Sequence, residues 1–100
     1  MIIYNVTINI DHSAHDEWLD WMKNVHIPDV MNTGMFIESK ILRLIGDHDS
    51  GGTTYAIQYT CTDMAAYEKY RDEFGAGLQK DALDKFGDKF TAFRTLLELV

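Results

Sequence analysis

The chain has 100 residues, 46% of them apolar, which suits one compact domain over residues 1–100 and leaves no proline-, glycine- or serine-rich linker to a second. Its 9 basic and 16 acidic residues give a formal net charge of −7, which argues against nucleic acid and anionic membrane surfaces as partners. The single cysteine, Cys61, rules out an intramolecular disulfide, and no apolar run nears the roughly 20 residues of a membrane span. Because the first residues lack the basic start of a signal peptide, we expect a cytoplasmic protein.

Residues 2–10 alternate between apolar and polar side chains, a period of two that predicts a strand with one face on a core. The apolar face holds Ile2, Tyr4, Val6, Ile8 and Ile10. The other face is mostly polar, with Asn5, Thr7 and Asn9.

A helix is predicted next, with Asp11 or Ser13 as its cap and acidic residues in its first turn. Its apolar residues recur at helical spacing and are Trp18, Leu19, Met22 and Val25. Pro28 restricts the residue before it, so we expect the helix to end near His26.

Residues 35–45 and 53–62 are predicted to be the second and third strands, paired as a hairpin. The segment between them, with Asp47-His48-Asp49 at its centre, has the composition of a solvated turn. A second helix follows Asp63, and we expect Gly75 and Gly77 to break or kink it before a shorter piece ends at Gly87. Residues 90–100 alternate again and predict the last strand.

The resulting order is β-α-β-β-α-β, an α+β fold of the ferredoxin-like type with a four-stranded antiparallel sheet and two helices on one face. Two helices cover only one face of such a sheet, so the other face meets water or a second molecule. We assign to that face the residues Ile3, Asn5, Thr7, Asn9, Ala56, Gln58, Thr60, Arg94, Leu96, Glu98 and Val100. This mixture of neutral polar and apolar groups is typical of a cavity wall.

His26 is the strongest candidate for a general base or a group that orients a ligand, because an imidazole suits proton transfer near neutral pH. The alternative is a histidine that binds free carbonyls at a helix C-terminus. Trp18 and Trp21 can form the wall of an aromatic ligand site, or can pack in the core or a dimer interface.

Asn5, Thr7, Gln58 and Arg94 can form a polar cavity floor, with Arg94 holding an anionic group of a ligand. Alternatively, Arg94 pairs with Glu98 across a dimer interface. His12 and His15, near Asp11 and Asp16, suggest a metal site, but no spacing signature fixes its geometry, so we expect neither a metal nor a cofactor.

Three segments of the chain resemble the DUF4286 family, a domain of unknown function within the dimeric α+β barrel group. They are Ile3-Tyr4-Asn5-Val6-Thr7, Trp18-x-x-Trp21-x4-His26-Ile27-Pro28 and Phe86-Gly87-Asp88-x-Phe90-x-Ala92-Phe93-Arg94-Thr95-x-Leu97-Glu98. The resemblance implies a homodimer whose two sheets meet face to face and enclose a cavity. Relatives in the wider group include monooxygenases, isomerases, stress-response proteins and haem-dependent enzymes.

Two main functions follow as hypotheses. The first is a protein that binds a small hydrophobic or aromatic molecule between the sheet faces without catalysis. The second is a cofactor-independent enzyme of the monooxygenase or isomerase type, with His26 as base and Asn5 or Arg94 positioning an oxyanion. A purely structural dimer is a third, and haem bound through His26 is a weaker expectation that comes from the resemblance alone.

Overall fold

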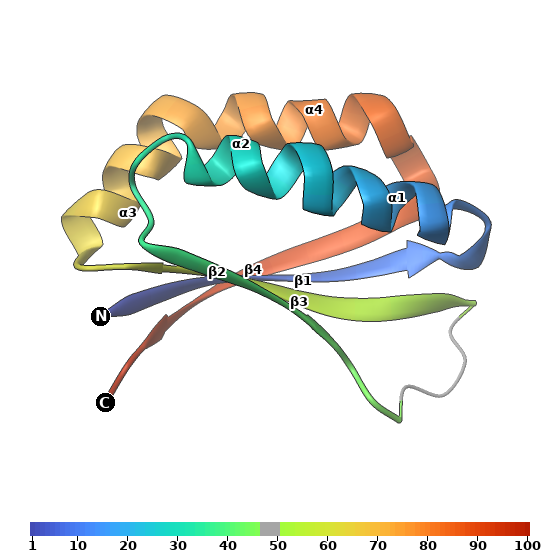
Figure 1. The fold of residues 1–100 in the computed structure, drawn as a ribbon, viewed down its shortest axis with the longest axis horizontal. Coiled ribbons are helices and arrows are strands. Elements are labelled where there is room, and N and C mark those ends of the chain that lie inside the picture. Colours follow the sequence, from blue (N-terminus) through green and yellow to red (C-terminus); the bar gives the residue numbers. More distant parts are fainter. Residues whose placement is uncertain (47–50) are drawn as a thin grey trace.

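The structure is a computed structural model that describes residues 1–46 and 51–100 (Figure 1). Its elements are β1 (Ile2–Asp11), α1 (His15–Trp21), α2 (Ile27–Met31), β2 (Glu38–Arg43), β3 (Gly52–Cys61), α3 (Met64–Tyr70), α4 (Ala76–Phe86) and β4 (Phe90–Glu98). The described strands form one antiparallel sheet in the order β2-β3-β1-β4, and the helices lie together on one face of it (Figure 1). The predicted ferredoxin-like α+β fold is confirmed.

The two central strands carry the core, as their alternation predicts. In the register of β1 and β3, Tyr4 faces Tyr59 and Val6 faces Ile57, and all four side chains are buried under the helices. Successive side chains of a strand point to opposite faces, so Asn5 and its neighbours Thr7 and Asn9 lie on the open face.

The facing of β4 corrects our expectation. Val6 is paired with Arg94, and paired residues of antiparallel strands share a face, so Arg94 lies on the helix-covered side. Leu96 and Glu98 lie there too, while Phe93 and Thr95 lie on the open face. The assignment failed because both alternating sets of β4 contain apolar residues, so its own pattern does not say which set faces the core.

The first helix continues past the proline, contrary to the prediction. A π-helical turn, Met22–His26, joins α1 to α2, and the Ile27 N–H donates to the Met22 carbonyl across this wider turn. Pro28 stands in the first turn of α2, where its missing N–H is tolerated. The extra residue of the π turn also keeps residues spaced by four on one side of the helix.

The second helix is likewise not broken by its glycines. A π-helical turn, Arg71–Gly75, joins α3 to α4, and Gly77 lies within α4. The helical segment begins after Asp63, whose side chain accepts a hydrogen bond from the Ala66 N–H, and ends at Gly87, as predicted. Gly87 has φ 54° and ψ −121°, a conformation that suits glycine.

Strand β2 is shorter than the predicted 35–45. Backbone bonds from the Ile37 N–H to Thr60 and from the Leu44 N–H to Thr54 extend its pairing by one contact at each end. Its antiparallel pairing with β3 confirms the predicted neighbours, but the predicted turn at Asp47-His48-Asp49 lies outside the described residues. No helix in the described part of the chain has the length and apolar character that a membrane crossing needs.

Candidate functional site

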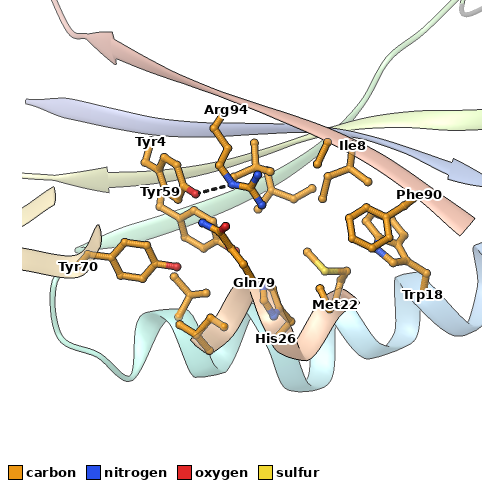
Figure 2. Close-up of a pocket in the computed structure, with 16 residues that line it drawn as sticks. Tyr4, Ile8, Trp18, Met22, His26, Tyr59, Tyr70, Gln79, Phe90 and Arg94 are labelled. Carbon is orange, nitrogen blue, oxygen red and sulfur yellow. Dashed lines mark hydrogen bonds between the residues drawn. The ribbon is translucent and has the colours of Figure 1, made fainter. Parts of the chain in front are cut away.

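A cavity of about 40 Å³ lies between the helices and the covered face of the sheet (Figure 2). Both central strands, both helical segments and β4 contribute to its wall. The lining residues are Tyr4, Val6, Ile8, Trp18, Met22, His26, Val30, Ile57, Tyr59, Tyr70, Leu78, Gln79, Ala82, Phe90, Ala92 and Arg94. The cavity thus lies inside a single chain, on the side of the sheet opposite to the face we expected to form a ligand site.

Among the described residues that line the cavity, His26 alone has a buried side-chain nitrogen or oxygen without a hydrogen-bond partner. Its Nδ1 is buried and has no hydrogen-bond partner within residues 1–46 and 51–100. Its ring is stacked on Trp21, with 4.8 Å between the ring centroids. The helix does not end at His26, so the alternative in which this histidine caps a helix end does not hold.

The surroundings of His26 keep its ring neutral at pH 7. Burial lowers its pKa below the ordinary value of 6.5, the carboxylates of Asp29 and Asp81 oppose this in part, and the charge of Arg94 lowers the pKa further. A neutral imidazole has one nitrogen free to accept a proton. His26 can therefore act as a hydrogen-bond acceptor or as a base in the cavity.

Three tyrosines bring phenol groups to the same region. Burial raises the pKa of Tyr4, Tyr59 and Tyr70, so all three hydroxyls are protonated at neutral pH and can donate hydrogen bonds. The rings of Tyr59 and Tyr70 lie 6.0 and 5.7 Å from that of Tyr4, measured between centroids.

Arg94 closes the cavity on the side of the edge strand. Its Nε donates to the hydroxyl of Tyr4 at 3.1 Å (Figure 2), and this bond partly offsets the effect of burial on the pKa of Tyr4. Two further hollows, of about 180 and 310 Å³, are also lined by Arg94. Arg94 therefore stands where the inner cavity meets the surface.

The predicted site residues divide between the two faces of the sheet. His26, Trp18 and Arg94 line the cavity, whereas Trp21 lies behind His26 and contacts Phe86 with 5.4 Å between ring centroids. The predicted association of Arg94 with the polar residues of the open face is wrong.

Asn5, Thr7 and Gln58 do lie together, as predicted, but on the open face. The Asn5 amide donates to the hydroxyls of Thr7 and Thr95 and accepts from the Gln58 amide, at 3.1 to 3.3 Å. These bonds satisfy an amide that is only 8% exposed in the single chain. The three residues do not line the cavity under the helices.

Four polar residues of the cavity were missed by the sequence reasoning: Tyr4, Tyr59, Tyr70 and Gln79. The signal was present for Tyr4, because the sequence places it on the apolar face predicted for residues 2–10. A phenol hydroxyl in a core needs a polar partner, so several of them together indicate a polar interior. Gln79 gave no comparable signal.

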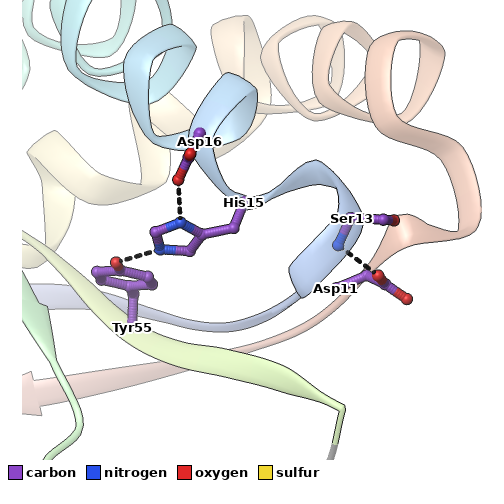
Figure 3. A network of polar contacts seen from close by, with 5 residues as sticks. All are labelled: Asp11, Ser13, His15, Asp16 and Tyr55. Carbon is purple, nitrogen blue, oxygen red and sulfur yellow. Dashed lines mark hydrogen bonds and ion pairs between the residues drawn. The ribbon is translucent and has the colours of Figure 1, made fainter.

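His15 has a structural partner on each side of its ring (Figure 3). Its Nε2 lies 2.7 Å from the hydroxyl of Tyr55 and its Nδ1 lies 2.8 Å from a carboxylate oxygen of Asp16. Asp11 instead accepts from the Ser13 N–H at 2.8 Å. Within the described residues, no three histidine, cysteine or acidic side chains are placed to hold a metal ion together.

Solved structures of low sequence identity share this fold. A dimeric ferredoxin-like protein from an uncultured marine organism has 16% identity and a TM-score of 0.69, over 100% of this chain and 95% of its own. MhuD, in a structure with two manganese protoporphyrin IX per active site, has 17% identity and a TM-score of 0.71, over 100% of this chain and 95% of its own. SnoaB, a cofactor-independent oxygenase from Streptomyces nogalater, has 18% identity and a TM-score of 0.67, over 98% of this chain and 92% of its own.

No functionally curated protein matches the sequence significantly. One family profile matches along the whole length of the chain, residues 1–100. The chain therefore belongs to the family described as "Domain of unknown function (DUF4286)".

Proposed function

We propose that the protein binds a small planar molecule in the cavity between the helices and the sheet of each subunit. The observation that carries the proposal is the buried Nδ1 of His26, which lacks a partner among the described residues. A buried polar atom without a hydrogen bond costs about 1–3 kcal/mol, so its place in a cavity wall points to a partner supplied from outside the chain.

The lining defines the chemistry of the ligand. Flat or aliphatic walls from Trp18, Met22 and Ile57 favour an apolar body, and His26 and Gln79 favour a hydroxyl or carbonyl group at its end. A volume of about 40 Å³ holds only one or a few waters. Binding therefore requires a side chain of the lining to move. Arg94 is the exposed residue among the described residues that line the cavity.

A second candidate function is cofactor-independent proton abstraction. It is favoured by the lowered pKa of His26, which keeps the ring neutral so that one of its nitrogens can take a proton from an acidic O–H or C–H of the ligand. The negative charge then rests on a ligand oxygen, which Arg94 and the Tyr4 hydroxyl can stabilise. The similar fold of SnoaB, a cofactor-independent oxygenase, agrees with such chemistry.

Haem is not part of the proposal. MhuD holds a metalloporphyrin, but pockets for drug-sized ligands have volumes of roughly 300–1,000 Å³. A tetrapyrrole is several times larger than a molecule of one or two rings, and movement of the single side chain of Arg94 would not make room for it in a cavity of about 40 Å³.

We also propose that two chains associate through the open face of the sheet. One row across this face runs from Leu42 through Ala56 and Thr7 to Phe93, and Phe93 is 62% exposed in the single chain. An exposed apolar row of this kind is typical of an interface. Two fold neighbours are described as dimeric.

The binding proposal is tested by nuclear magnetic resonance on protein with ¹⁵N-labelled histidine, titrated with phenol and 2-naphthol. We expect both probes to shift the ring nitrogens of His26, and His26→Phe to weaken phenol binding about tenfold through the loss of one hydrogen bond. His12→Gln, at an exposed histidine, is the control and should bind as the wild type does. Absence of any shift at His26 with either probe would overturn the proposal.

Catalysis is distinguished from binding by deuterium uptake into phenylacetone in heavy water. If His26 is a base, the wild type accelerates the exchange and His26→Phe removes the acceleration about 100-fold or more. Equal exchange rates for the two proteins leave binding as the function of the site.

A further inference from the structure

The hollows around Arg94 are free of acidic side chains in the described part of the chain, although the molecule as a whole carries a net charge of −7. None of the described residues that line the inner cavity, or the two outer hollows that share Arg94, is aspartate or glutamate. By contrast, a hollow elsewhere on the helical side is lined by Asp29, Glu73 and Asp81. A negatively charged ligand in these hollows would therefore meet no carboxylate among the described lining residues.

Arg94 itself has binding capacity left. A guanidinium has five N–H donors, and the one side-chain hydrogen bond found for Arg94 within the described residues uses only Nε, which donates to the Tyr4 hydroxyl. Arg94 takes part in none of the ion pairs found within residues 1–46 and 51–100. Its planar fork matches a carboxylate, which it can hold by two parallel hydrogen bonds.

On these grounds we propose that the ligand of this site is a small planar monocarboxylate, held by Arg94 at the mouth of the cavity, with its apolar body directed inward and a hydroxyl or carbonyl group of that body, where it has one, nearest His26. This inference rests on the proposed binding function and names its ligand class. One carboxylate is sufficient because Arg94 is the only cation among the described residues that line the cavity, His26 being neutral.

The same residue controls access to the cavity. In the free protein the bond from Arg94 to Tyr4 holds the guanidinium across the boundary between the inner cavity and the outer hollows. A carboxylate that engages the fork from the outer hollow replaces that bond and draws the side chain outward. The inner cavity then joins a hollow of about 310 Å³, which is lined by Tyr67, Thr95 and Leu96 beside Tyr4 and Arg94.

The test compares trans-cinnamate with trans-cinnamamide, which have the same size and shape and differ in charge. We expect the wild type to bind cinnamate about 10- to 100-fold more tightly, because hydrogen bonds to charged groups are the stronger ones. Arg94→Gln should abolish this preference, so that the variant binds cinnamate and cinnamamide with equal affinity. Arg43→Gln, at an exposed arginine outside the cavity lining, is the control and should keep the preference.

A second readout reports where the carboxylate sits. The charge of Arg94 lowers the pKa of His26, while Asp29 and Asp81 raise it. A carboxylate on Arg94 offsets that charge, so the pKa of His26, followed by ¹⁵N resonance, should rise with cinnamate more than with cinnamamide. The difference should vanish in Arg94→Gln.

The outcomes separate this inference from the function on which it rests. Equal affinities of the wild type for cinnamate and cinnamamide, unchanged in Arg94→Gln, would overturn the carboxylate assignment and leave binding of neutral planar molecules intact. Absence of binding by both compounds, together with the absence of shifts from phenol and 2-naphthol, would overturn both.

Discussion

At the residue scale, the two histidines of the first helical segment are opposites. Both ring nitrogens of His15 have partners, whereas the Nδ1 of His26 is buried without one in the described structure. An unsatisfied buried group lowers stability, and a satisfied one does not. His15 therefore stabilises the folded protein, whereas His26 lowers its stability.

Replacing each histidine by phenylalanine should change stability in opposite directions. We expect His26→Phe to raise the free energy of unfolding by about 1–2 kcal/mol, because it removes an unpaired buried nitrogen and keeps a ring against Trp21. His15→Phe should lower it by a similar amount, since the hydroxyl of the buried Tyr55 loses its partner. Urea denaturation measures both, and a loss of stability in His26→Phe would contradict the prediction.

Titration of His26 should make the stability of the folded protein depend on pH. Its pKa in the folded protein is below the ordinary 6.5, so between these two values the unfolded chain binds a proton that the folded chain does not. This contribution to stability is complete above pH 6.5 and is lost as the pH falls from 6.5 to the folded pKa.

His26→Phe removes this dependence. The unfolding midpoint in urea, measured between pH 5 and 8 for the variant and the wild type, checks the prediction. Parallel curves for the two proteins would mean that His26 has the same pKa in both states.

At the element scale, the π turns set which side chains reach the cavity. Trp18, Met22, His26 and Val30 all line it, although an α-helix of 3.6 residues per turn carries a four-residue spacing steadily around its axis. The one extra residue of the Met22–His26 turn corrects this drift. This π turn also precedes Pro28. In a regular α-helix the proline ring would clash with the carbonyl one turn earlier.

Deleting the exposed Lys23 should convert the π turn into a regular turn and destabilise the protein by about 3 kcal/mol, because Pro28 then lies inside an α-helix. Adding Pro28→Ala to the deletion should restore most of this loss. Thermal and urea unfolding of the single and double variants measure the coupling. If the deletion is equally destabilising with alanine at 28, the proline is not what the π turn accommodates.

The elements differ in how far their sequences predict them. Strands β1 and β3 were assigned correctly because their buried and exposed sets differ sharply in polarity. Strand β4 has apolar residues in both sets, so the position of Arg94 could be known only from its pairing with Val6. Pro28 was taken as a helix end because local rules contain no signal for a π turn.

At the scale of the whole molecule, the open face is the surface through which we propose that two chains associate. Phe93, Leu97 and Leu42 lie exposed on it in the single chain, next to the hydrogen-bonded row around Asn5. The sequence led us to expect an interface there and also a ligand cavity between two such faces. The cavity found in one chain lies on the other side, because helices and sheet already enclose space within the subunit.

Placing a charge in the apolar row should prevent association. We expect Phe93→Glu to weaken dimer formation at least tenfold, because the carboxylate is buried without a partner against the second sheet. Leu83→Glu, at an exposed leucine of α4, is the matched control and should associate as the wild type does. Sedimentation velocity at micromolar concentration measures both, and a monomeric wild type would refute the interface itself.

Arg94 and Phe93 are neighbours in β4, but they lie on opposite faces of the sheet. A shift of this edge strand that accompanies ligand uptake at Arg94 displaces Phe93 at the same time. Ligand affinity and subunit affinity are then joined by a coupling free energy, and reciprocity requires that each alters the other by the same factor. If a ligand binds at Arg94 and two chains associate through Phe93, as proposed, a shift of this edge strand would report occupancy of the interior as a change in the state of assembly.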